Sequence, residues 1–269
     1  MPPRRGWSHS FAAWVRANPQ HAPHAHSPAY TAIYTQVPAQ EALPALSQAA
    51  AIYATSPGLV TQLRRLGGEA KPVSLWRPAL SPRIWQELTF GTGLNTRPRV
   101  LWFDEGIAPP WLADLINGTL EIASWIVVER KGAGYAGSVA RIGMQESEFA
   151  WAQTMAELGP QIMIRPAAAA THADHYPALI AAAAGCRLLV DERLDTPPSL
   201  GALALPPRAN AWGEALKGAI TGLQATLEQG ATTRAAALAL PGLEDAPPPW
   251  LGLPVAPQAG SAAYQSAAE

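Results

Sequence analysis

The sequence predicts an α/β protein with a doubly wound, mostly parallel sheet, a shortened N-terminal α/β portion and extended termini. Two observations predict this class. First, short runs of β-branched and apolar residues alternate with helical stretches of about ten to twenty residues, which is the pattern of βαβ units. Second, the chain has 269 residues, of which 48% are hydrophobic and 14% charged, so it is long and apolar enough to bury a large core.

The first α/β elements are expected within residues 29–95. Strands are predicted at residues 29–37, 51–56 and 71–80, helices at residues 38–50 and 57–67, and a short helical or linking piece at residues 81–88. Pro57 suits the first position of a helix and Gly67 suits its end. Leu59, Leu63 and Leu66 fall at helical spacing, so we expect these three leucines to share the buried face of this helix.

The pattern restarts after the stretch FGTGLNTRP, which places a domain boundary near residue 96. Strands are then predicted at residues 99–105, 124–130, 139–144, 161–166, 186–192 and 201–207, and helices at residues 109–123, 146–159, 176–185 and 210–230. The predicted organisation is a flexible segment (1–28), the shortened N-terminal portion (29–95), a complete domain (96–229) and a Pro/Ala-rich tail (230–269).

Composition excludes several classes of function. A net charge of -1 creates no field that would attract nucleic acid or an anionic membrane. No apolar run approaches the length of about 20 residues that a membrane span needs, and the N-terminus lacks the apolar core of a secretory signal. The one cysteine, Cys186, lies in an apolar run and is expected to be a core residue. We therefore expect a cytoplasmic protein.

Ligands of open parallel sheets bind beyond the carboxyl ends of the strands, and this rule selects the candidate loops. They are Asp104–Gly106, Arg130–Gly132, Arg165–Pro166 with the following His172–His175, and Asp191–Arg193. The His172, Asp174 and His175 group is compatible with metal binding or acid–base chemistry, but also with plain capping of the next helix by Asp174. The glycine-rich stretch at residues 132–137 lacks an immediate helix, so it predicts a loop rather than a dinucleotide fingerprint.

Two stretches resemble the GT-B glycosyltransferases of the "group 1" type. The first combines IYATSPGLVTQLRRLGG with VSLWRPAL and SPRIW, and is similar to the end of that family's N-terminal domain. The second, THADHYPALIAAAAGCRLLVDE, is similar to the family's donor-binding segment through Pro177, Gly185 and the strand that follows. The resemblance covers about residues 45–225 and implies a Rossmann-like domain of the GT-B C-terminal type.

The resemblance also implies a set of site residues. The family's two glutamates, which contact the donor sugar and ribose, correspond to His172 and Ile180, so His172 is the candidate catalytic residue. The family's basic pair for the pyrophosphate has acidic residues in its place, Asp104 and Glu105. The candidate ligand-binding residues are Arg130, Lys131, Arg165, Asp174 and His175. No metal and no cofactor is expected, apart from a nucleotide sugar as donor substrate.

The sequence leaves two functions open. One is a glycosyltransferase-like enzyme that binds a nucleotide-diphosphate sugar and transfers the sugar to an acceptor. The other is a catalytically inactive GT-B-like module that is a structural or binding subunit of a larger assembly, with protein partners or further copies contacted through the termini. The replaced glutamates and the short N-terminal portion favour the second function, whereas the family resemblance favours the first.

Overall fold

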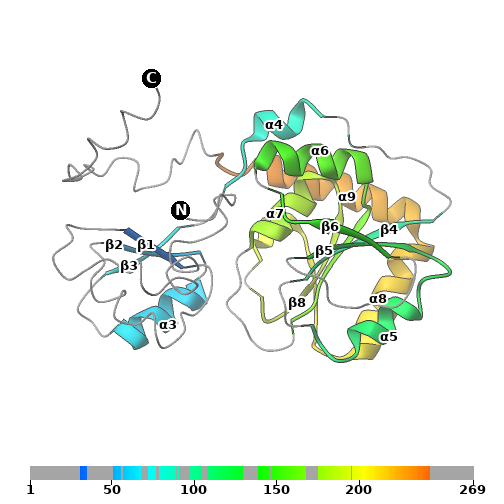
Figure 1. Cartoon of the computed structure of the whole chain (residues 1–269), viewed down its shortest axis with the longest axis horizontal. Helices are drawn as coiled ribbons and strands as arrows, with labels where there is room; N and C mark the ends of the chain where they lie inside the picture. Colours follow the sequence, from blue (N-terminus) through cyan, green and yellow to red (C-terminus); the bar gives the residue numbers. More distant parts are fainter. Residues whose placement is uncertain are drawn as a thin grey trace, which may run out of the picture.

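Two parallel sheets organise the protein in the computed structural model (Figure 1). The structure describes residues 31–34, 51–55, 57–67, 72–76, 79–88, 90, 97–104, 108–129, 139–145, 147–167, 175–194 and 196–242. The predicted helix at residues 38–50 and both termini, with the histidines at positions 21, 24 and 26, lie outside these ranges.

The smaller sheet has the order β1-β2-β3, and its described neighbours are parallel. Its elements are β1 (Thr31–Tyr34), β2 (Ala51–Ala54), α3 (Pro57–Gly67) and β3 (Val73–Leu75). Leu59 and Leu63 of α3 are fully buried against the sheet, as the helical spacing predicts, together with Val60. Leu66 is 45% exposed, so the prediction that it shares the buried face is wrong. The third buried side chain of this face is Val60.

A short helix, α4 (Pro82–Gln86), follows the smaller sheet and is held by the larger unit. The fully buried indole of Trp85 donates a hydrogen bond to Glu148 Oε1 at 2.8 Å, and the backbone N–H of Ser81 donates to the same oxygen at 2.6 Å. From another helix, Arg234 donates to the carbonyl of Trp85 at 2.8 Å and lies over the ring of Phe90. The segment between the two sheets is therefore fixed to the second unit at several points.

The larger sheet has six parallel strands in the order β6-β5-β4-β7-β8-β9. The strands are β4 (Arg99–Asp104), β5 (Ser124–Glu129), β6 (Val139–Gly143), β7 (Ile162–Arg165), β8 (Arg187–Asp191) and β9 (Leu203–Leu205). The helices are α5 (Leu112–Asn117), α6 (Glu148–Leu158), α7 (Tyr176–Ala183), α8 (Ala209–Thr221) and α9 (Leu223–Leu238). This confirms the predicted doubly wound parallel sheet.

Helices cover both faces of this sheet, and each face has its own core (Figure 1). We call the side covered by α6, α7 and α9 the α7 face, and the side covered by α5 and α8 the α8 face. Side chains alternate along each strand, so Leu101 and Met163 belong to the α7 face, while Trp102 and Ile164 belong to the α8 face. Central strands buried on both sides explain the nearly continuous apolar runs in the sequence.

The single helix predicted at residues 210–230 is instead two helices, α8 and α9, which meet at Gly222. Helical structure then continues to Leu238, into the stretch that the composition assigns to the tail. The reason is packing: Ala237 is buried in the core of the α7 face, although α9 has no strong apolar stripe by which the sequence would reveal it.

Candidate functional site

The strand order defines a crevice at one point of the larger sheet. The chain moves outward from β4 through β5 to β6, and then returns to the other side of β4 to continue through β7, β8 and β9. The direction therefore reverses between β4 and β7. The loops that follow these two strands diverge at such a switch point, and ligands of doubly wound sheets bind there.

Asp104 ends β4 and Arg165 ends β7, so these residues border the crevice. Because side chains alternate, Arg165 follows Met163 onto the α7 face, whereas Asp104 follows Trp102 onto the α8 face. Arg165 is only 2% exposed, and Asp104 is half-buried. The positive and negative groups at the switch point thus lie on opposite faces of the sheet.

Helix α7 follows β7 in the chain and packs on the face toward which Arg165 points, so its N-terminus lies at the same edge of the sheet as the end of β7. Its N-cap residue is His175, which is 3% exposed and gives no side-chain hydrogen bond to the first turn of the helix. Pro177 stands in that first turn, which a helix tolerates because an N–H there needs no helical partner. A helix N-terminus carries partial positive charge and favours an anion.

The end of β8 carries a network that connects it to the end of β7. Asp191 is fully buried, and its carboxylate accepts two hydrogen bonds from the guanidinium of Arg193, from Nε at 2.8 Å and from a terminal nitrogen at 2.7 Å. The backbone N–H groups of Arg193 and Ala167 also donate to this carboxylate. The same terminal nitrogen of Arg193 donates to the carbonyl of Ala167 at 2.6 Å. Both backbone groups of Ala167 are therefore held from β8.

This network controls the charge of Asp191. Burial by itself would raise the pKa of the carboxyl, but the hydrogen bonds from the Arg193 side chain and from the two backbone N–H groups outweigh it, so the pKa of Asp191 lies below its usual value. A second acid–arginine pair, Glu129 with Arg141, has one contact between the two side chains, at 3.3 Å. The side chain of Glu129 is more exposed than that of Asp191. Of the two pairs, Asp191 with Arg193 is therefore the more buried and has more hydrogen bonds.

Two of the predicted ligand-binding residues fall in the described part of the chain. Arg165 and His175 are both buried, and both lie at the switch point, one at the end of β7 and the other at the start of α7. His172, Asp174, Arg130 and Lys131 lie outside the described residues, as does the glycine-rich stretch at 132–137. Among the described residues, no group of three or more His, Cys, Asp or Glu side chains is arranged to hold a metal ion.

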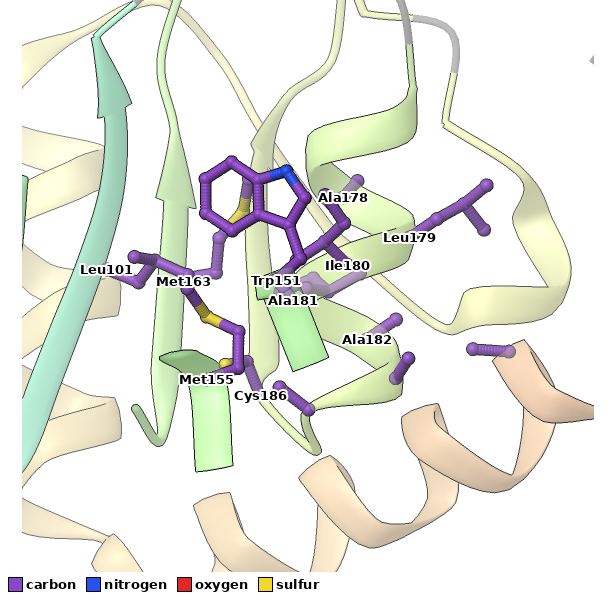
Figure 2. Packing of buried hydrophobic residues seen from close by; sticks show 14 of the residues in the cluster. Leu101, Trp151, Met155, Met163, Ala178, Leu179, Ile180, Ala181, Ala182 and Cys186 are labelled. Carbon is purple, nitrogen blue, oxygen red and sulfur yellow. The ribbon is translucent and has the colours of Figure 1, made fainter. Parts of the chain in front are cut away.

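Ile180, at the position of the second family glutamate, is a core residue. It is 1% exposed, and Figure 2 shows it on α7 among Met163, Trp151 and the neighbouring alanines. Cys186 belongs to the same core, as predicted, and burial raises the pKa of its thiol well above the usual value. The loop Asp191–Arg193 was among the predicted edge loops, but nothing in the sequence indicates that Arg193 reaches Ala167, just beyond the end of β7.

The chain was compared with known proteins. No protein-family model matches the sequence, and no curated protein matches it. Among solved structures, sucrose-phosphate synthase from Thermosynechococcus elongatus superposes with a TM-score of 0.57 at 15% identity, over 87% of this chain and 68% of that chain. Anabaena HepE in complex with UDP superposes with a TM-score of 0.52 at 13% identity, over 78% of this chain and 67% of that chain. The protein has the GT-B glycosyltransferase fold.

The GT-B fold agrees with the resemblance that the sequence shows. This chain spans about two thirds of the length of these two proteins. At identities of 13% and 15%, the likeness shows the fold alone. In the described part of this GT-B protein, no helix has the length and apolar character to cross a membrane.

Proposed function

We propose that this GT-B protein binds a nucleotide-diphosphate sugar at the crevice between the ends of β4 and β7 and transfers the sugar to an acceptor. The observation that carries the proposal is the position of Arg165 and the N-terminus of α7 on one face of the sheet, at the switch point. A guanidinium and the positive end of a helix both favour a diphosphate. HepE, whose structure contains UDP, supports this class of ligand by its fold.

Each predicted site residue has a role in this proposal. Arg165 is the counter-charge for phosphate, and its burial strengthens the attraction because the surroundings are less polar than water. His172, in the place of the first family glutamate, is the catalytic residue and donates a hydrogen bond to the donor sugar. Asp174 and His175 complete the binding loop before α7, and Arg130 and Lys131 supply further positive charge from the loop after β5.

A second function, a GT-B module without catalysis that is a binding or structural subunit, is favoured by Ile180. This residue is 1% exposed and apolar where the resembling enzymes have a glutamate for the ribose. The isoleucine side chain has no polar atom, so it cannot form the hydrogen bond that a glutamate would make with a ribose. The missing contact lowers the expected affinity for the nucleotide, and with it the case for turnover.

Thermal-shift and calorimetric titration with nucleoside diphosphates and their sugars tests the proposal. Binding raises the melting temperature in proportion to the logarithm of ligand concentration above Kd. We expect Arg165→Met to weaken binding of a matching diphosphate by about ten- to a hundredfold, because a charge-assisted contact is worth about 1.5–3 kcal/mol. Arg97→Met is the matched control, since Arg97 is an exposed arginine just before β4, at the opposite edge of the sheet.

The two functions separate in a turnover assay. If the wild-type protein hydrolyses or transfers a nucleotide sugar at a rate that His172→Ala abolishes, the non-catalytic alternative is wrong. If nucleotides bind but no sugar is released with any acceptor, the subunit function stands and the transferase function falls. If no nucleotide or nucleotide sugar shifts the melting temperature at millimolar concentration, nucleotide binding itself is wrong.

A further inference from the structure

We propose that Arg193 is a phosphate-binding residue of the crevice, held in position by Asp191 and Ala167 and presenting its remaining terminal nitrogen to the ligand. The inference rests on the proposed function, because it concerns the same ligand and the same edge of the sheet. The loop Asp191–Arg193 was among the predicted edge loops, and the inference gives Arg193, two residues beyond β8, a role that neither the sequence pattern nor the family resemblance assigned to it.

The guanidinium of Arg193 uses only part of its hydrogen-bonding capacity within the protein. Nε and one terminal nitrogen of Arg193 bond to Asp191, and that same terminal nitrogen also bonds to the carbonyl of Ala167. Three of the five N–H groups of the guanidinium are thus engaged. The other terminal nitrogen, Nη1, forms no hydrogen bond with any described residue, so its two N–H donors remain available.

The side chain of Arg193 is both partly exposed and held in place. The side chain of Arg193 is 27% exposed, whereas that of its partner Asp191 is fully buried. An arginine on a loop normally loses side-chain entropy when it binds a ligand, but this one is already fixed by its bonds to β8 and β7. A rigid guanidinium with one outward edge is suited to the oxygen atoms of a phosphate, which accept from that edge.

Arg193 also lies close to the crevice. The carbonyl that Arg193 binds belongs to Ala167, two residues beyond Arg165, and β7 is one of the two strands that border the crevice. The network therefore brings a cation from β8 to the end of β7. Arg165 approaches the crevice from the α7 face, while Asp191, the anchor of Arg193, belongs with Leu189 to the α8 face. A diphosphate lying across the strand ends would meet positive charge from both faces.

The experiment compares ligands that differ in the number of phosphates. Dissociation constants are measured by calorimetry for uridine, UMP and UDP, or for the corresponding series of the base that the wild-type protein prefers. Arg193→Lys keeps the ion pair with Asp191 but has no second terminal nitrogen. We expect it to weaken the diphosphate by about tenfold or more and to leave the nucleoside within about twofold, with a melting temperature close to that of the wild type.

Two further variants keep the outcome clear. Arg193→Met removes both the pair and the outward nitrogen, and Arg97→Met removes an exposed arginine from the opposite edge of the sheet. Equal diphosphate affinity in wild type and Arg193→Lys, or a loss in Arg193→Lys that is the same for nucleoside and diphosphate, overturns the role of Arg193 while nucleotide binding stands. Absence of any binding by the wild type overturns the proposed function and this inference together.

Discussion

The two faces of the six-stranded sheet differ in how closely their helices approach one another. On the α7 face, α7 contributes mostly alanines, and its C-terminal turn approaches α9 so closely that a Cβ atom on Gly230 would lie 2.1 Å from the carbonyl oxygen of Gly185. On the α8 face, the start of α5 and α8 meet through the rings of Trp111 and Trp212, at 5.7 Å between centroids. The α7 face also has a ring pair, Phe103 with Trp151 at 5.5 Å, but it joins β4 to α6 and not one helix to another. Small side chains let backbones approach, whereas large ones hold them apart.

This difference decides what each face can accept. The close contact between α7 and α9 leaves no room for a methyl group on Gly230, and a charge placed among the buried residues of α7 would lose its hydration. The α8 face has helix positions such as Gly213, where an added Cβ atom would meet nothing within 4 Å. We expect substitutions of the same kind to have opposite effects on the two faces, and the following predictions test this from the largest effect to the smallest.

Ile180→Glu should have the largest effect. The change restores the residue type of the resembling enzymes, but it places a carboxylate at a position that is 1% exposed on the α7 face. An uncompensated buried charge costs about 3–5 kcal/mol. Urea unfolding should show this loss, whereas Ile180→Leu should cost less than about 1.5 kcal/mol. A stable Ile180→Glu protein with sugar-transfer activity would show that the position faces the crevice.

Gly230→Ala should destabilise the protein by about 3 kcal/mol, the upper part of the range for overpacking. The added methyl group meets backbone atoms of the turn at Gly185, which has φ +84° and cannot easily move, rather than a flexible side chain. Thermal and urea unfolding measure the loss. An unchanged stability would mean that α9 shifts on α7 without cost, and that the α7 face is looser than its contacts indicate.

Asp191→Asn should lower stability at neutral pH by about 2 kcal/mol, because it weakens charge-assisted hydrogen bonds to Arg193 in a buried site. The folded-state pKa of Asp191 is lowered, so its ionised form stabilises the protein above the usual aspartate pKa of about 3.9. That contribution is lost as pH falls through the lowered folded value. The difference between wild type and variant, measured by urea unfolding, should therefore shrink in acid.

Glu148 on α6 gives the opposite sign and is the control for the Asp191 experiment. Burial raises the pKa of Glu148, although the hydrogen bonds from Ser81 and Trp85 oppose the shift. The folded state therefore holds this proton more tightly, and stability falls as pH rises through the raised pKa. Glu148→Gln should gain relative to wild type as pH rises. If both variants change with pH in the same direction, the assigned shifts are wrong.

Gly213→Ala should give the smallest effect, a gain in stability. The position is in the middle of α8, and a Cβ atom there contacts nothing within 4 Å. Alanine is favoured over glycine in a helix interior by about 0.5–1 kcal/mol. A rise in melting temperature is the expected result, and a loss would indicate that the helix lies closer to its neighbours than described.

Much of the larger sheet was predictable because its signal is local. Runs such as residues 99–104 and 187–191 are apolar on both sides, short, and bounded by turn residues, which is typical of buried parallel strands. Once the strands are assigned, the rule that ligands bind beyond the carboxyl ends of parallel strands selects the loop at Arg165. The boundary between α8 and α9 was missed because Gly222 and the residues around it carry a pattern that also suits one continuous helix.

The sequence by itself determined the class of fold, the order of strands and helices in the larger unit, and the carboxyl-edge loops, since these depend on periodicity and on short-range turn chemistry. Only the tertiary structure decided that Ile180 is a core residue, that α9 docks beside Gly185, and that Arg193 reaches Ala167. Each of these depends on atoms brought together from distant parts of the chain, and the distance and burial of such contacts leave no periodic trace in the sequence.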